Sequence, residues 1–190
     1  LVTLAKGRPF GFLDHNLRCG DSLLGIHRLA QLIDLDLDPR SELHQRRLFG
    51  QSIEAAVNDA VELRKRLREV PIRDVRDIDA MARLDAESRR IVETPLLVAD
   101  AFVGEVLRSN STKKSIKAPL DVLAVEADRV TDGDTASREA IRTRAAQALA
   151  VDPRSGKRMR RPFHWPLEFP EVFERENPGF DAITGNPPFM

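Results

Sequence analysis

The stretch Phe180-Asp181-Ala182-Ile183-Thr184-Gly185-Asn186-Pro187-Pro188-Phe189 decides the predicted fold. Its first half, Phe180–Thr184, combines aromatic and β-branched residues, a composition typical of a short buried strand. The polar and turn-forming residues come directly after it. In open α/β sheets, functional groups follow the carboxyl ends of the strands. We therefore predict an α/β fold in which this strand belongs to a sheet and Asn186 lies at the edge of that sheet.

A strand followed by Asn-Pro-Pro-Phe resembles the catalytic motif of amino-methyltransferases, which move a methyl group from S-adenosylmethionine to an exocyclic amine. Such an amine is a poor nucleophile because its lone pair is delocalised into the ring. The resemblance implies that the Asn186 side chain and the Pro187 carbonyl accept the amine hydrogens. Pro187 and Pro188 fix φ and lack an N–H, which holds that carbonyl rigidly. Phe189 would stack on the target base.

A second segment, Asn16-Leu17-Arg18-Cys19-Gly20-Asp21-Ser22-Leu23, lies near the amino terminus. Leu17–Cys19 is predicted to be a strand, with Gly20 and Asp21 as the turn at its carboxyl end. The segment resembles the part of these methyltransferases in which an acid faces the adenine of the cofactor. Asp21 would then accept a bond from the cofactor's amino group, with Ser22 beside it. A plain turn or a helix cap is the alternative interpretation.

The aromatic segment 163–173 precedes the last predicted strand. With the two motifs, it resembles adenine-specific DNA methyltransferases of the restriction–modification type, with type II or type IIG organisation. The family implies a partial class I, Rossmann-like methyltransferase sheet with a long helical insert. It also implies S-adenosyl-L-methionine as cofactor, double-stranded DNA with a flipped adenine as substrate, and a nuclease domain or subunit as partner. The biological setting would be restriction–modification or phage defence. Phe189 stands where many relatives have Tyr, which keeps the stacking surface.

Three zones are expected: 1–33 in the methyltransferase core, 34–151 as the helical insert, and 152–190 as the basic, aromatic and catalytic segment. Apolar residues at alternating spacings of four and three predict a helix packed against a long partner helix. They are Phe49, Ile53, Ala56, Ala60, Leu63, Leu67 and Val70.

A second apolar stripe follows between about Val75 and Leu107, so we expect two antiparallel helices joined around Pro71–Asp74. Pro95 should kink or break the second helix near Thr94, because proline removes a backbone donor and clashes with the preceding turn. A further helix is expected after Pro119. The last helix of the insert should run from about Thr135 to Ala150, and Asp134 should cap it.

A basic run opens the third zone, and it could contact DNA phosphates beside the catalytic pocket. A solvated loop is the alternative interpretation. The residues of this run are Arg154, Lys157, Arg158, Arg160 and Arg161.

The overall composition is neutral, with 30 basic and 30 acidic residues, and argues against a self-contained DNA-binding domain. The single cysteine, Cys19, excludes an intrachain disulfide and is not placed as a nucleophile, which disfavours methylation of a cytosine ring carbon. The histidines and aspartates show no metal-ligand spacing, so no metal site is predicted. Without an apolar stretch long enough to cross a bilayer, or a secretion signal, we expect no membrane partner and a cytoplasmic location.

The chain begins at Leu1 without an initiating Met and ends directly after the Pro-Pro-Phe motif, which we interpret as an internal fragment. The glycine-rich cofactor loop and the DNA-reading domain of the family do not occur in it, so the fragment alone is not expected to methylate DNA. Two other functions stay open. One is a glutamine-directed protein methyltransferase, which uses a similar Asn-Pro-Pro motif. The other is a non-catalytic helical interaction module.

Overall fold

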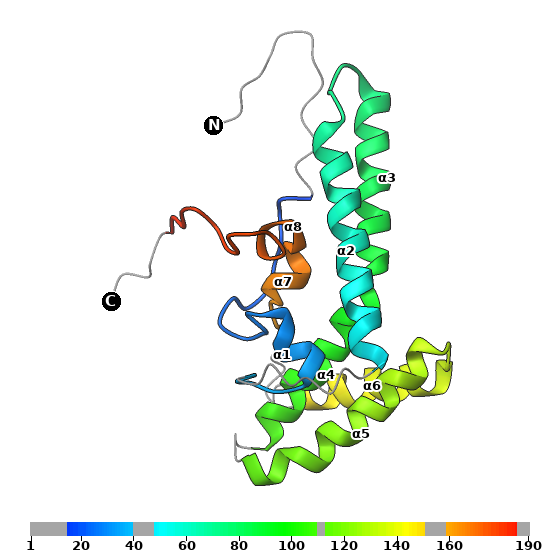
Figure 1. The fold of residues 1–190 in the computed structure, drawn as a ribbon, viewed down its shortest axis with the longest axis vertical. Coiled ribbons are helices and arrows are strands. Elements are labelled where there is room, and N and C mark those ends of the chain that lie inside the picture. Colours follow the sequence, from blue (N-terminus) through cyan, green and yellow to red (C-terminus); the bar gives the residue numbers. More distant parts are fainter. Residues whose placement is uncertain (1–14, 40–47, 110–112, 151–158, 186–190) are drawn as a thin grey trace.

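Eight helices make up most of the part of the chain that the structure describes, and non-helical segments precede α1 and flank α7 and α8 (Figure 1). This computed structural model describes residues 15–39, 48–109, 113–150 and 159–185. The helices are α1 (Leu29–Asp34), α2 (Leu48–Glu69), α3 (Val75–Ile91), α4 (Glu93–Arg108), α5 (Lys113–Thr131), α6 (Thr135–Leu149), α7 (Trp165–Glu168) and α8 (Pro170–Phe173).

The predicted α/β fold is wrong for these residues, because none of them forms a sheet. Phe180–Thr184 is not a strand, and Ile183 is 82% exposed. Leu17–Cys19 is not a strand either. A strand needs a neighbouring backbone to satisfy its N–H and C=O groups, which strand-forming side chains alone do not provide. The described backbone offers these two stretches no such ladder, so the Rossmann-like sheet is withdrawn.

Helices α2 and α3 form a hairpin that stands out from the rest of the molecule (Figure 1). The chain reverses between Glu69 and Val75. Asp74 caps α3, since its carboxylate accepts bonds from the backbone N–H groups of Arg76 and Asp77 at 2.7 and 3.3 Å. The predicted pair of antiparallel helices joined around Pro71–Asp74 is confirmed.

The buried stripe of α2 is broader than the predicted seam. Ala56 and Leu63 are only partly buried. The strict heptad fails because α2 packs against α1, α5 and α8 as well as α3, so more than one face is covered. The buried residues of α2 are Phe49, Gly50, Ile53, Val57, Ala60, Val61, Arg64 and Leu67.

The predicted break near Thr94 is confirmed. Helix α3 ends at Ile91, Val92 joins the two helices, and α4 begins at Glu93. Pro95 is the third residue of α4, where its missing N–H has no partner to lose within the helix.

Helices α4, α5 and α6 pack together below the hairpin, with α1 beside them (Figure 1). Their core contains the fully buried side chains of Phe102, Leu123 and Ile141. Helices α4 and α6 approach closely at Gly104, where an added Cβ would lie 2.7 Å from the Cβ of Ala148. This base is the main apolar core of the chain, and the hairpin rises from it.

Two expectations for the base had different outcomes. The predicted start of a helix after Pro119 is wrong, because α5 begins at Lys113 and contains Pro119. The expected last helix is confirmed as α6, and the Asp134 carboxylate accepts a bond from the Ala136 N–H at 2.9 Å. This cap could be predicted from the sequence because a helix N-cap depends only on neighbouring residues.

Candidate functional site

Two segments far apart in the chain lie side by side next to α7. Asp21 and Pro162 form an isolated parallel bridge, and the Asp21 N–H donates to the Arg161 carbonyl at 2.8 Å. Further along, the Phe163 N–H donates to the Leu24 carbonyl at 2.6 Å. The segment with the predicted cofactor acid is therefore paired with the start of the aromatic segment.

Two glycines make this close approach possible. A Cβ at Gly20 would lie 2.9 Å from the Phe163 ring. A Cβ at Gly25 would lie 2.6 Å from the carbonyl carbon of Phe163, and closer still to the oxygen. Only glycine leaves room for the Phe163 backbone at position 25.

A buried histidine joins the paired segments to the helical base. The His164 side chain is 2% exposed, and its Nδ1 accepts a bond from the Ile26 N–H at 3.3 Å. Its Nε2 lies 3.1 Å from Asp100 Oδ1 on α4. Because Nδ1 is the acceptor, the ring hydrogen lies on Nε2 and points at the Asp100 carboxylate.

An aromatic cluster continues from this point toward the carboxyl end of the described chain. The Trp165 Nε1 donates to the Ser22 carbonyl at 3.1 Å. The ring of Phe180 meets Trp165 edge-on, with the ring centroids 5.9 Å apart. It also meets Phe169 and Phe173, at 5.4 and 5.9 Å. Phe180 therefore packs as a ring contact of the aromatic segment and not as the first residue of a buried strand.

The predicted site residues fall partly inside the described structure. Asn186, Pro187, Pro188 and Phe189 lie outside the described residues, as do Arg154, Lys157 and Arg158. The remaining predicted residues, Asp21, Ser22, Arg160 and Arg161, are all exposed and lie at or next to the bridge.

Asp21 forms the turn that the alternative interpretation expected. Its Oδ1 accepts a bond from the Leu23 N–H at 3.1 Å. Among the described residues, no hydrogen bond to its Oδ2 occurs, and its side chain is exposed. The local turn and a ligand contact are compatible.

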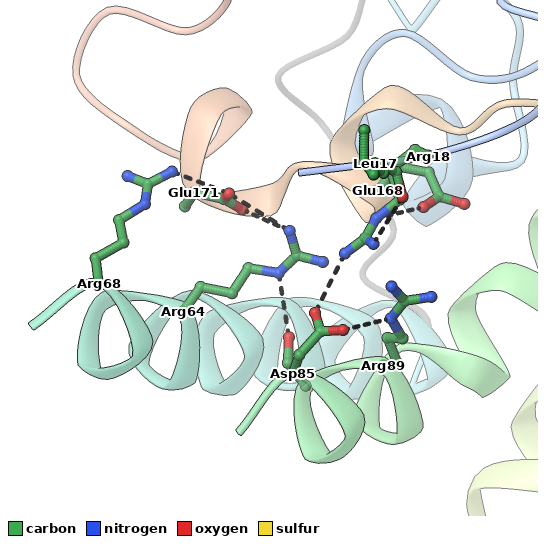
Figure 2. Close-up of polar contacts among 9 residues, drawn as sticks. Leu17, Arg18, Arg64, Arg68, Asp85, Arg89, Glu168 and Glu171 are labelled. Carbon is green, nitrogen blue, oxygen red and sulfur yellow. Dashed lines mark hydrogen bonds and ion pairs between the residues drawn. The ribbon is translucent and has the colours of Figure 1, made fainter. Parts of the chain in front are cut away.

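A buried ion-pair cluster lies on the other side of the paired segments, between the hairpin and α7–α8 (Figure 2). The Arg18 guanidinium contacts Asp85 on α3 at 3.4 Å and Glu168 on α7 at 3.2 Å. The Arg64 guanidinium contacts Glu171 on α8 at 3.1 Å. These side chains tie the amino-terminal segment, the hairpin and the carboxyl-terminal segment together.

The outer arginines complete the cluster. Arg68 contacts the second oxygen of Glu171 at 3.0 Å, and Arg89 contacts Asp85 at 2.8 Å. Arg64 also donates from Nε to the buried Ser88 hydroxyl at 3.2 Å. Each carboxylate of the cluster therefore faces at least one guanidinium, as buried charges require.

Sequence reasoning missed this cluster, although a signal was present. Arg64 continues the apolar stripe of Val57, Ala60 and Val61, and a charge on such a stripe indicates a buried partner. The partner, Glu171, lies more than a hundred residues away, so its identity could not be read from local spacing.

Burial shifts the pKa of Arg64 in the cluster and of His15, whose pKa the charges of the cluster also affect. It lowers the pKa of Arg64, and the nearby Arg18 charge lowers this pKa further, while Glu171 opposes the shift. Burial also lowers the pKa of His15 below its ordinary value of 6.5, with Asp85 opposing. The imidazole of His15 is therefore harder to protonate than one in water.

Comparison with protein-family models, curated proteins and solved structures finds no match to this chain. None of the described helices is long and apolar enough to cross a membrane. Function must therefore be argued from the residues and contacts of the chain itself.

Proposed function

We propose that this chain carries the cofactor-adenine segment and the target-amine motif of an S-adenosylmethionine-dependent adenine DNA methyltransferase. One observation supports it above the others: Asp21 pairs with the start of the aromatic segment at Pro162, although the whole helical insert separates them in the chain. Two of the three regions that carry the family resemblance, the Asp21 segment and the aromatic segment, are thus neighbours in space.

Ring contacts extend this proximity toward the Asn-Pro-Pro motif. Trp165 contacts the Ser22 backbone and the ring of Phe180. Asn186 follows Phe180 by six residues, a length of chain that spans at most about 20 Å. The contact between Phe180 and Trp165 therefore supports the proposal, because it anchors the segment that leads to the motif beside the Ser22 backbone.

The donors and acceptors at this place suit the proposed ligand. Asp21 is exposed, and its carboxylate can accept a bond from the amino group of an adenine. S-adenosylmethionine would supply the electrophilic methyl group. The Asn186 side chain and the Pro187 carbonyl would orient the target amine and localise its lone pair, and Phe189 would stack on the extruded base. Arg160 and Arg161 would contact DNA phosphates.

The test measures transfer of labelled methyl groups from S-adenosylmethionine to mixed-sequence DNA by the full-length protein. Asn186→Ala should lower kcat by roughly a hundred-fold or more, because it removes an acceptor aimed at the reacting amine. Asp21→Asn should raise the KM for the cofactor with little change in kcat, since Asp21 contacts only the adenine moiety. Asp59→Asn, on the exposed face of α2, is the matched control and should change neither constant.

The other outcomes separate the alternatives. Cofactor binding without transfer to DNA would move the acceptor to a protein amide and favour the glutamine-directed enzyme. Failure to bind S-adenosylmethionine at all would reject the methyltransferase and favour a helical interaction module.

A further inference from the structure

A cavity of about 390 Å³ opens between the hairpin, α4, α7 and the amino-terminal segment, on the cluster side of the paired segments. Four arginines from four different parts of the chain line it, and Glu168 is the one acidic residue among the lining residues described. The lining residues are Leu17, Arg18, Cys19, Arg64, Arg89, Val92, Leu96, Arg161, Leu167 and Glu168.

Guanidinium groups outnumber carboxylates among the described residues of the cavity and the adjoining ion-pair cluster. Five guanidinium groups stand against three carboxylates there. Because the pKa of His15 is lowered, its imidazole is uncharged near neutral pH and adds nothing to this count of charges. The guanidiniums are those of Arg18, Arg64, Arg68, Arg89 and Arg161, and the carboxylates those of Asp85, Glu168 and Glu171.

The inner arginines are held in place before any ligand arrives. The side chains of Arg18 and Arg64 are 5% and 3% exposed, and carboxylates from α3, α7 and α8 fix their guanidiniums. Their like charges repel across the cluster, as the effect of Arg18 on the pKa of Arg64 shows. An anion between them would relieve this repulsion without the cost of ordering long side chains.

Arg161 adds an exposed guanidinium to the lining of the cavity. Arg161 is exposed and makes no ion pair or side-chain hydrogen bond within the described residues. It lies next to Pro162, so the parallel bridge with Asp21 fixes its backbone. Arg161 therefore contributes a positive charge to the cavity lining from a backbone that the bridge holds in place.

The size and remaining walls indicate more than a bare ion. A volume of about 390 Å³ lies in the range of small-molecule sites and exceeds the needs of a single phosphate. Val92, Leu96 and Leu167 form an apolar wall that would suit the face of a base or a sugar. Guanidinium groups bind phosphate oxygens in pairs and also stack on planar rings.

We propose that this arginine-lined cavity binds a phosphate ester of a nucleoside, with the phosphate among the guanidiniums and the nucleoside against the apolar wall. Two sources share this chemistry: a free mononucleotide, and one nucleotide of a DNA strand. The inference does not depend on methyl transfer, because Asp21 is not among the described residues that line the cavity.

The single cysteine makes the cavity observable. Cys19 is exposed and lines the cavity, so a bound ligand should shield it from alkylation by N-ethylmaleimide. The rate of Cys19 alkylation in the full chain is measured against increasing adenosine 5′-monophosphate, adenosine, inorganic phosphate, or a single-stranded oligonucleotide. We expect saturable protection by the monophosphate and weak protection by adenosine or phosphate alone.

Arg161→Gln should weaken this protection by about ten-fold, because it removes one charge-assisted pair of bonds to the phosphate. Arg90→Gln is the matched control: its side chain is also exposed and it follows the lining residue Arg89 in the chain, but it is not among the lining residues described. Both substitutions leave the buried ion pairs of the cluster unchanged, so we expect both variants to fold.

The outcomes are distinct. Tighter protection by the monophosphate identifies a free nucleotide, and tighter protection by the oligonucleotide identifies a DNA strand. Equal protection by adenosine and its monophosphate overturns the proposal, as does an equal loss in Arg90→Gln and Arg161→Gln, which would indicate diffuse attraction. Protection by none of the four probes also overturns it. A loss of methyl transfer in Asn186→Ala with Cys19 protection unchanged would show that the two sites are separate.

Discussion

The guanidinium of Arg64 on α2 and the carboxylate of Glu171 on α8 form an ion pair 3.1 Å long in which both side chains are 3% exposed. Glu171 also accepts from Arg68, and Arg64 also donates to Ser88. The pair joins the hairpin to the carboxyl-terminal segment that leads to the Asn-Pro-Pro motif. Its integrity therefore bears on both the fold and the proposed site.

Removing one partner of this pair should be strongly destabilising. Glu171→Ala leaves the Arg64 charge buried without its carboxylate, and we expect a loss of about 3–5 kcal/mol in the free energy of unfolding. Urea denaturation monitored by circular dichroism measures it. Glu62→Ala, which removes an exposed pair with Lys65, is the control and should leave the midpoint nearly unchanged.

A double variant separates loss of charge pairing from loss of packing. Arg64→Met combined with Glu171→Leu replaces the ion pair by apolar groups of similar size, and it should be more stable than Glu171→Ala. A double variant no more stable than Glu171→Ala would contradict this account.

His15 should make the fold sensitive to acid. Burial is the main cause of its lowered pKa, and Arg64 and Arg68 add to it, against Asp85 and Glu171. The unfolded chain therefore binds a proton more readily than the folded one. The contribution of neutral His15 to the free energy of unfolding is fully present above 6.5, the pKa of the imidazole in the unfolded chain. It is lost as the pH falls below 6.5 toward the lower pKa of the folded state.

Urea midpoints at several pH values between about 7.5 and 5 measure this dependence. His15→Gln should flatten the curve just below pH 6.5, because the titrating group is gone. His27→Gln, at an exposed position, should keep the slope of the parent protein. An unchanged slope in His15→Gln would assign the acid sensitivity to other groups.

The paired segments depend on the absence of a side chain at position 25. Gly25→Ala would drive a Cβ into the Phe163 backbone, so we expect a loss of at least about 2–3 kcal/mol in the free energy of unfolding. Gly133→Ala is the control: its φ of +89° is also unfavourable for alanine, but nothing lies within 4 Å of the added Cβ. Equal thermal unfolding midpoints for the two variants would show that the segments do not pack this closely.

Local signals predicted the helices well. The apolar stripe of α2, the turn at Pro71–Asp74, the break near Pro95 and the cap at Asp134 each depend on neighbouring residues. Pro119 misled because proline was taken to start a helix, whereas α5 accommodates it in its interior at the loss of one backbone bond.

Contacts between segments that are distant in the sequence could not be predicted in the same way. Phe180–Thr184 has the composition of a strand, but the described backbone gives it no strand to pair with, and Phe180 packs into an aromatic cluster instead. The bridge between Asp21 and Pro162 joins positions at opposite ends of the insert. Gly20 and Gly25 hint at a close backbone approach, but nothing local says that Phe163 is the partner. The roles of Asp21 and Asn186 stay predictions.

Phe180 should control the start of the Asn-Pro-Pro segment. Its ring contacts Trp165, Phe169 and Phe173, and such aromatic pairs contribute roughly 0.5–1.5 kcal/mol each beyond their burial. Phe180→Ala should therefore release the segment from the cluster and expose the Trp165 indole. Because Trp165 is the only tryptophan, its fluorescence emission should shift to longer wavelength.

Ile183→Ala is the matched control in the same segment. Its side chain is 82% exposed, so its truncation should leave the emission of Trp165 unchanged. In the full-length protein, Phe180→Ala should also lower the rate of methyl transfer more than Ile183→Ala does. The reason is that the segment carrying Asn186 would no longer be anchored by the ring contacts of Phe180. A shifted emission with unchanged transfer would separate the aromatic cluster from catalysis. An unshifted emission would contradict the contact between Phe180 and Trp165 itself.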